Sequence, residues 1–191
     1  MVSIQRPTPH QIQQFLANQS RLDPTYPPPN LNPHSTPPGY VVDQSRTLLG
    51  HGPETFLRAR AALERWDQFR LGWVETWPPN PPPHEGQVLA ILAHLFGLWW
   101  LNACRITAVF DQPGPLTRFG LAYTTLPDHA GSGQERFLLD WDQATNTVHF
   151  EIQAISRPQW LVARLFYPYM RHLQNRFRRE ATAALAHAVH S

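Results

Sequence analysis

Prolines constrain the fold of this 191-residue chain more than any other feature of its sequence. Nine of its 20 prolines lie in residues 1–40, and five more lie in the stretch "PPNPPP" at 78–83. Because proline fixes φ and removes a backbone donor, neither stretch can form a continuous helix or a central strand. We therefore expect a proline-rich N-terminal arm over residues 1–39, followed by one domain over residues 40–191.

The arm has room for one short helix. Thr8 is a suitable N-cap, and Pro9 fits the first turn. Ile12, Phe15 and Leu16 then share one helical face. The following stretch, "DPTYPPPNLNPHSTPPG", is expected to be extended and either to lie across the domain or to remain mobile, with binding to a groove on a partner as the alternative.

Composition narrows the function classes. The chain is 42% hydrophobic, enough for a sizeable core, and its formal net charge is only +2, too small to argue for nucleic acid binding. A single cysteine cannot form an internal disulfide, and the first ten residues lack a secretory signal pattern. We expect a cytoplasmic protein with no nucleic-acid partner.

The domain begins with a strand near residues 43–49 and a helix that starts at Gly52 and Pro53. From residue 72 to residue 155 the apolar pattern has a period of two, which predicts an antiparallel meander with one buried face. Its turns are expected at 111–115, 127–133 and 142–146. The inward positions are expected to include Phe119, Leu121, Tyr123, Phe137, Leu139, Val148, Phe150 and Ile152.

A helical pattern returns after Pro158 for about thirty residues. Its apolar stripe contains Phe166, Met170, Leu173, Phe177, Ala181, Ala184, Leu185 and Ala188. Pro168 predicts either a kink or the true start of the helix. Four arginines fall mostly off the stripe and predict a solvated face, or a contact with an anionic membrane surface: Arg171, Arg176, Arg178 and Arg179.

Residues 88–104 carry no formal charge and include the pair Trp99 and Trp100. As a helix they would span roughly 26 Å, just short of a bilayer core. His94 and Asn102 inside the run favour two strands joined near 94–97 instead. In that arrangement Trp99 and Trp100 point to opposite faces of the sheet, and one of them faces inward.

The order of elements predicts an α+β helix-grip fold, in which a curved antiparallel sheet wraps around a long C-terminal helix. We expect a bent sheet and one covering helix to leave an apolar cavity between them.

Several stretches carry a resemblance to a known family: "LLGHGPETFLRARAALERWDQFRLGWVE", "LWWLNACRITAVFD", "RFGLAYTTLPDHAGSGQERFLLDW" and "AISRPQWLVARLFYPYMRHLQNRF". Together they resemble the domain-of-unknown-function family numbered 1990, over about residues 40–189. That family looks similar to the START and Bet v 1 helix-grip domains, which hold lipids, sterols and other hydrophobic molecules. The resemblance therefore implies the same fold and a small hydrophobic ligand.

Candidate ligand-binding residues are the aromatic, amide and charged side chains on the expected strands or their ends. They are Trp73, Trp99, Trp100, Asn102, Arg105, Tyr123, Glu135, Phe150 and Arg157. Arg105 or Arg157 would anchor an anionic or carbonyl head group, and a structural network of arginines and carboxylates is the alternative. The histidines are scattered, so we expect no metal and no cofactor.

The leading function is noncatalytic binding or carriage of a small hydrophobic molecule. The first alternative is a cyclase- or hydratase-like enzyme that uses an inward acid, with Glu75, Tyr123 and His129 as candidates. An inward carboxylate without an arginine partner would favour the enzyme, because its pKa would be raised. The second alternative is a membrane-associated protein.

Overall fold

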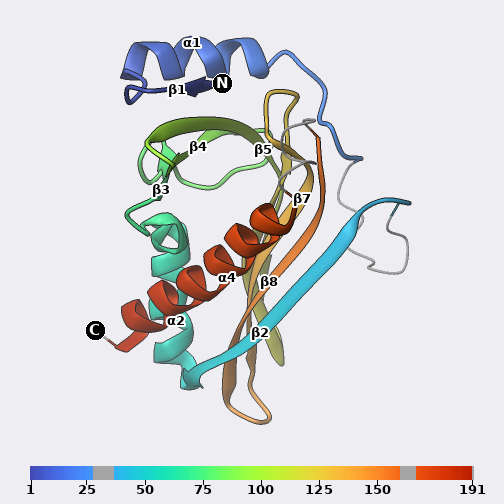
Figure 1. Ribbon diagram of the computed structural model, residues 1–191. Helices are drawn as coiled ribbons and strands as arrows, with labels where there is room; N and C mark the ends of the chain where they lie inside the picture. Colours follow the sequence, from blue (N-terminus) through green and yellow to red (C-terminus); the bar gives the residue numbers. More distant parts are fainter. Residues whose placement is uncertain (28–36, 160–166, 191) are drawn as a thin grey trace.

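A computed structural model describes the chain except residues 28–36, 160–166 and 191. In these described parts, eight strands form one antiparallel sheet in the order β2-β8-β7-β6-β5-β4-β3, with β1 paired to β5 (Figure 1). The strands are β1 (Val2–Ser3), β2 (Val41–His51), β3 (Val74–Trp77), β4 (Val88–Leu95), β5 (Leu98–Gln112), β6 (Leu116–Thr125), β7 (Gly131–Asp142) and β8 (Thr147–Pro158). The predicted meander is confirmed.

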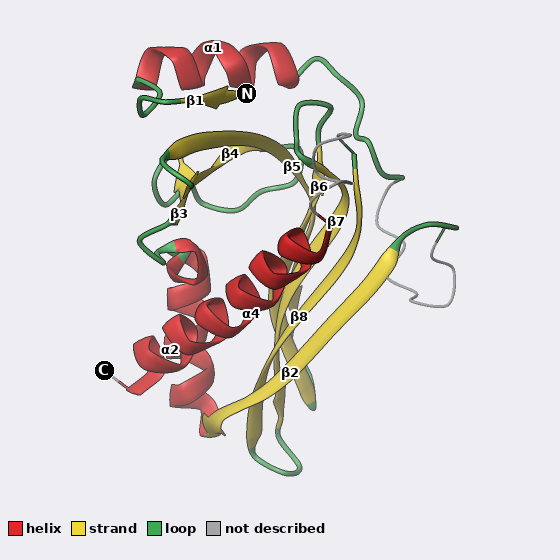
Figure 2. Cartoon of the chain, in the orientation of Figure 1, coloured by secondary structure: helices red, strands yellow, loops and turns green. Residues whose placement is uncertain are grey.

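Helices lie on both faces of this curved sheet. They are α1 (Pro9–Gln19), α2 (Gly52–Glu64), the 3₁₀ turn η2 (Asp67–Phe69) and α4 (Tyr167–His190). Figure 2 shows α2 and α4 on the inner, concave side of the sheet and α1 on the opposite side of β4 and β5. The sheet wraps around the C-terminal helix, which confirms the predicted helix-grip fold.

The predicted helix in the N-terminal arm is confirmed as α1. Its N-cap Thr8 accepts a hydrogen bond from the backbone N–H of Gln11, whose side chain accepts one from the N–H of Thr8. Ile12, Phe15 and Leu16 are buried against the outer face of β4 and β5. Part of the segment expected to be extended, residues 28–36, lies outside the described residues.

The apolar run at 88–104 forms the two predicted strands. Phe96 and Gly97 link them with φ values of 56° and 71°, and Leu95 pairs with Leu98, as in a two-residue type I′ hairpin. The run is apolar throughout because both faces of this part of the sheet are covered. In the described parts of the chain, no helix is long and apolar enough to cross a membrane.

Aromatic side chains fill the middle of the space between the sheet and α4. The ring centroid of Phe69 lies 5.1 Å from that of Phe177 and 5.7 Å from that of Phe137. Phe137 in turn stacks on Phe150 at 6.3 Å. The centre of the expected cavity is therefore occupied by these rings.

Helix α4 begins at Tyr167, so Pro168 lies in its first turn and marks the start of the helix rather than a kink. Leu173, Ala181 and Leu185 of its stripe are buried, whereas Phe166 lies outside the described residues.

The expectation of a solvated arginine face on α4 is wrong for Arg171 and Arg178. Both turn toward the sheet and form ion pairs with Asp43 of β2. Arg176 pairs with Glu180 through Nε at 2.7 Å. Arg171 and Arg178 therefore bring positive charge to the inner face of the sheet, whereas Arg179 is exposed.

Candidate functional site

A polar row crosses the inner face of the sheet near the N-terminal end of α4. In the strand register, Tyr123 lies opposite Glu135, Glu135 opposite Ala154, and Ala154 opposite Asp43. Side chains two residues apart along a strand share a face, so Phe137 lies on the same face about 7 Å deeper. The polar row therefore borders the aromatic core directly.

Tyr123 and Glu135 form a hydrogen-bonded pair within this row. The Tyr123 hydroxyl donates to Oε2 of Glu135. Burial raises the pKa of Glu135 to about 7, even though the Tyr123 hydrogen bond and the charge of Arg178 lower it. Burial, together with the negative charge of Glu135, also raises the pKa of Tyr123 well above its ordinary value. Near neutral pH this pair can therefore both donate and accept hydrogen bonds.

Asp43 is held by two arginines of α4. Nη2 of Arg171 lies 2.6 Å from Oδ1 of Asp43, Nη1 of the same guanidinium contacts Oδ2, and Nη1 of Arg178 lies 3.3 Å from Oδ2. Burial raises the pKa of Asp43, but the hydrogen bonds and charges of Arg171 and Arg178 outweigh it and lower the pKa below its ordinary value. Asp43 is thus ionised at neutral pH.

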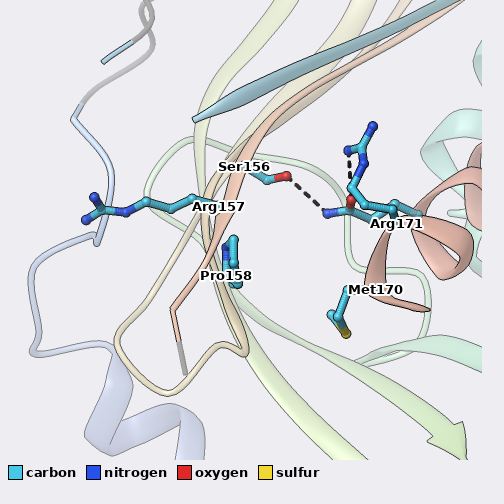
Figure 3. A pocket seen from close by; sticks show the side chains of 7 residues that line it. Ser156, Arg157, Pro158, Met170 and Arg171 are labelled. Atoms are coloured by element: carbon cyan, nitrogen blue, oxygen red, sulfur yellow. Dashed lines mark hydrogen bonds between the residues drawn. The ribbon is translucent and has the colours of Figure 1, made fainter. Parts of the chain in front are cut away.

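A small cavity lies between the ends of β7 and β8 and the first turns of α4 (Figure 3). Its volume is about 20 Å³, which is room for about one water. Nε2 of Gln174 donates to Oγ of Ser156 across it over 3.0 Å. The cavity is lined by Gly131, Ser156, Arg157, Pro158, Met170, Arg171 and Gln174.

Two inner-facing residues near this end of β8 are not fully buried. Ala154 and Ser156 point inward and are partly exposed, whereas Gln153 and Ile155 on the outer face are buried. Glu135, beside Ala154, is also partly exposed. The inner face is therefore less completely covered around the polar row than at the aromatic core.

Four of the residues expected in a ligand site face the interior. Tyr123 and Glu135 belong to the polar row, and Phe150 lies in the aromatic core. Trp100 packs against the same core from β5.

Three others meet at a second pocket. Trp73, Glu75 and Trp99 line it together with Arg70, Gly72, Val74 and Leu92, and its volume is about 280 Å³. Glu75 forms an ion pair with Arg6, and Trp99 stacks on His94 with ring centroids 4.7 Å apart. Glu75 thus lies on the outer face, beside the N-terminal segment, and not next to Tyr123.

Asn102 and Arg105 form hydrogen bonds with backbone groups of neighbouring segments. Asn102 accepts a hydrogen bond from the N–H of Ala130 over 3.1 Å and so holds the β6–β7 loop. Arg105 donates through Nη2 to the backbone carbonyls of Ser20 and Leu22, just beyond the C-terminus of α1.

Arg157 and His129 also point away from the polar row. Arg157 is directed away from the cavity in Figure 3 and lies over the ring of Tyr40, with 4.7 Å between its Cζ and the ring centroid. Nδ1 of His129 accepts from the N–H of Gly131 over 3.0 Å, and burial lowers the pKa of His129 to about 4. The structure does not bring Arg105, Arg157 or His129 to Glu135.

Sequence reasoning missed Asp43, Ser156 and Gln174 and assigned Arg171 and Arg178 to solvent. One signal was available, because positions 171, 174 and 178 are three and four residues apart and so share one face of a helix. The partner of these arginines, Asp43, could not be identified in the same way. No sequence pattern showed that β2 pairs with β8 and lies under that face of α4.

Cys104 and the possible metal-ligating side chains were also located in the structure. Burial raises the pKa of Cys104 well above its ordinary value, so its thiol is neutral. Among the residues described, no three His, Cys, Asp or Glu side chains are grouped to hold a metal ion.

Comparison with known proteins gives relatives that match most of this chain. A UPF0548 protein from Dictyostelium discoideum is 37% identical over 146 residues, which cover 72% of this chain and 68% of the relative. A UPF0548 protein from Deinococcus radiodurans is 29% identical over 201 residues and 99% of both chains.

Among solved structures, a hypothetical protein from Helicobacter pylori shares the fold with a TM-score of 0.52 at 10% identity, over 81% of this chain and 92% of that one. The model of the family described as a domain of unknown function (DUF1990) matches residues 25–184. This match covers most of the chain, including α2, α4 up to residue 184 and every strand from β2 to β8, and the chain therefore belongs to the DUF1990 family.

Proposed function

We propose that this protein binds a small hydrophobic molecule with a polar end between the sheet and the first turns of α4. The observation that carries the proposal is the partial exposure of Ala154, Ser156 and Glu135 on the inner face, where a filled core would bury them. A ligand that covers this partly exposed surface would be stabilised there, because binding removes its apolar part from water. The resemblance to START and Bet v 1 domains agrees with this site.

The chemistry of the site favours a molecule with both polar and apolar parts. Tyr123 and Glu135 offer hydrogen bonds to a hydroxyl or carbonyl group. Phe137 and Phe177 supply the apolar wall next to them. A molecule larger than a water needs more room than the present cavity of about 20 Å³, so binding would require the first turns of α4 to shift away from β7 and β8.

Native mass spectrometry of the purified protein, followed by solvent extraction, tests for a bound molecule. A second measurement is titration with a fluorescent apolar probe. The variant Ala154→Phe fills the inner face next to Glu135 and should abolish probe binding, whereas Ala183→Phe on the exposed side of α4 is the matched control. Equal binding by both variants, with no extracted molecule, would contradict the proposal.

One observation supports an enzyme as a second candidate. Glu135 is an inward carboxylate and, in the described part of the chain, has no arginine within ion-pair distance. Its pKa of about 7 is suited to proton transfer at neutral pH. In this candidate Glu135 replaces Glu75 as the inward acid, with Tyr123 as its partner.

The remaining expectations stay predictions. They are a cytoplasmic location, a peripheral contact with an anionic membrane surface and the absence of a nucleic-acid partner. Flotation with anionic liposomes at low and high salt tests the membrane contact, because a contact made only by surface charge is lost at high salt.

A further inference from the structure

Two of the most exposed large apolar side chains in the described part of the chain, Ile4 and Phe96, lie at one corner of the sheet. Ile4 is 80% exposed and Phe96 is 74% exposed. Strand β1 pairs with β5 through Ser3 opposite Trp99, and this register places Ile4 beside Leu98 at the start of β5. Leu98 directly follows the β4–β5 turn that contains Phe96. Segments far apart in the sequence therefore bring these exposed side chains together.

Phe96 occupies a turn position that disfavours it. Its φ is 56°, and a type I′ turn favours asparagine or glycine there because both tolerate a left-handed backbone. A phenylalanine that is mostly exposed recovers little of this cost through burial. A residue that contradicts both the turn preference and the burial preference is expected at a functional surface.

The first turn of α4 extends the same surface. The ring centroid of Tyr169 lies 4.9 Å from that of Phe96, and Tyr169 also stacks on His172 at 6.2 Å. Val2 lies opposite Trp100 in the β1–β5 pair and is exposed as well. We call the exposed set the apolar corner; it consists of Val2, Ile4, Phe96 and Tyr169.

The segments that meet at the apolar corner are rich in arginine and contain no acids. Residues 1–22, 88–110 and 167–179 include seven arginines and none of the 14 Asp and Glu residues of the chain. Three acids from other segments form ion pairs with some of these arginines; they are Asp43, Glu75 and Glu180. Arginine therefore remains in excess in these segments.

An apolar corner with an excess of arginine matches the surface of an anionic membrane. Binding to a bilayer interface combines burial of apolar side chains with attraction to anionic lipids. A hairpin tip presents its side chains outward, where they can enter such an interface. A second copy of this chain fits the corner less well, because it would bring the same excess of positive charge.

We propose that the apolar corner, with Phe96 at its tip, inserts into the interfacial region of an anionic lipid bilayer. The contact is peripheral, since only the β4–β5 turn, the N-terminal segment and the first turn of α4 take part. This inference goes beyond the proposed function and does not depend on a bound ligand.

The test uses the full chain and two kinds of vesicle, pure phosphatidylcholine and an equal mixture of phosphatidylcholine and phosphatidylglycerol. In a flotation assay at low salt, the protein should bind the mixed vesicles at least about tenfold more tightly than the neutral ones. High salt should weaken this binding without abolishing it, because salt screens the charges but not the burial of apolar side chains.

Phe96→Asn separates insertion from a structural role of the ring. Asparagine followed by Gly97 is favoured in a type I′ turn, so the variant should be at least as stable as the wild type. Its binding to the mixed vesicles should nevertheless fall about tenfold. Ile4→Ser should weaken binding as well. Leu57→Gln replaces an exposed apolar side chain of α2 and is the matched control, which should bind like the wild type.

An environment-sensitive dye locates the inserted residue. Cys104 is buried, so in Phe96→Cys the dye labels the new thiol. Its emission should shift to the blue when the mixed vesicles are added. The same dye on Leu57→Cys should show no shift.

Several results would overturn this inference and leave the proposed function standing. They are no binding of the wild type to mixed vesicles, complete loss of binding at high salt, wild-type binding by both Phe96→Asn and Ile4→Ser, and equal dye shifts at positions 96 and 57. A wild-type dimer that becomes a monomer in Phe96→Asn, measured by sedimentation, would assign the apolar corner to a second copy of the chain instead.

Discussion

The hydroxyl of Tyr123 on β6 donates a hydrogen bond to Oε2 of Glu135 on β7, and the two residues lie directly opposite each other on the inner face of the sheet. Burial raises the pKa of Glu135 from its ordinary value of 4.5 to about 7. Between these two pH values the folded protein holds a proton that the unfolded chain releases. The unfolded state is therefore favoured as pH rises through this window.

Glu135→Gln should remove this loss of stability. The wild-type protein has the full contribution of protonated Glu135 below about pH 4.5 and loses it as pH rises through about 7. The variant keeps a neutral side chain at every pH, so above pH 7 it should be more stable than the wild type by up to about 3 kcal/mol. Urea unfolding at a series of pH values measures the difference.

His129 contributes a pH dependence of stability with the opposite sign to that of Glu135, and it does so in a more acidic pH range. Burial lowers its pKa from 6.5 to about 4, so the protein loses stability as pH falls through that window. Both the wild type and Glu135→Gln contain His129, and subtracting one curve from the other removes its contribution. A difference curve that is flat from pH 4 to pH 8 would show that Glu135 is not protonated in the folded protein.

Arg105→Gln should lower stability without changing ligand binding. Nη2 of Arg105 donates to the carbonyl of Ser20 over 2.7 Å and to that of Leu22 over 3.1 Å, just beyond the end of α1. Losing these bonds should cost about 1 kcal/mol. Chemical unfolding gives that cost, and titration with the fluorescent apolar probe should give the wild-type affinity. Weakened probe binding in a stable variant would instead support the head-group role expected from the sequence.

The order of elements could be predicted because its signals are local. The capping box at Thr8, the period-two pattern of the meander and the helical stripe after Pro158 each depend on residues close together in the chain. The layer formed by α1 was harder to foresee. Its contact with β4 and β5 joins residues about 80 positions apart. The only sequence signal for it is that residues 88–104 are apolar at alternating positions of both kinds, which indicates that both faces of these strands are covered.

The site could be predicted only in part, because alternation assigns a residue to a face but does not say what lies opposite. Tyr123 and Glu135 were identified as candidates from their place among aromatic residues. Arg105 has the same sequence character, yet it follows Cys104, which points inward, and so it points outward. The pairing of Asp43 with Arg171 joins β2 to α4 over 128 positions, and no local pattern encodes it.

Gly97→Ala should destabilise the protein through its backbone alone. Gly97 has a φ of 71°, and a Cβ added there would meet no atom within 4 Å. The cost is therefore the strain of a left-handed conformation, about 1 kcal/mol. Thermal unfolding measures it. Gly97→Asn is the matched comparison, because asparagine tolerates this conformation better, and it should lose clearly less stability than the alanine variant.

Trp99 and Trp100 are adjacent in β5 but pack on opposite faces of the sheet. The helix α1, which covers the outer face, should therefore contribute to stability as the inner core does. Trp100 contacts the inner core, whereas Trp99 packs in the cluster that α1 covers. Phe15 of α1 is buried in that cluster and only 8% exposed, so Phe15→Ala should cost about 3 kcal/mol. It should also increase binding of a dye that reports exposed apolar surface.

Gln14→Ala, on the exposed side of the same helix, provides the control for this variant. It leaves the apolar contact intact, and alanine favours a helix at least as well as glutamine, so its unfolding free energy should equal that of the wild type. If Phe15→Ala were as stable as Gln14→Ala, α1 would add little to the fold. The apolar outer face of β4 and β5 would then have to be stable without its helical cover, which its unbroken apolar sequence argues against.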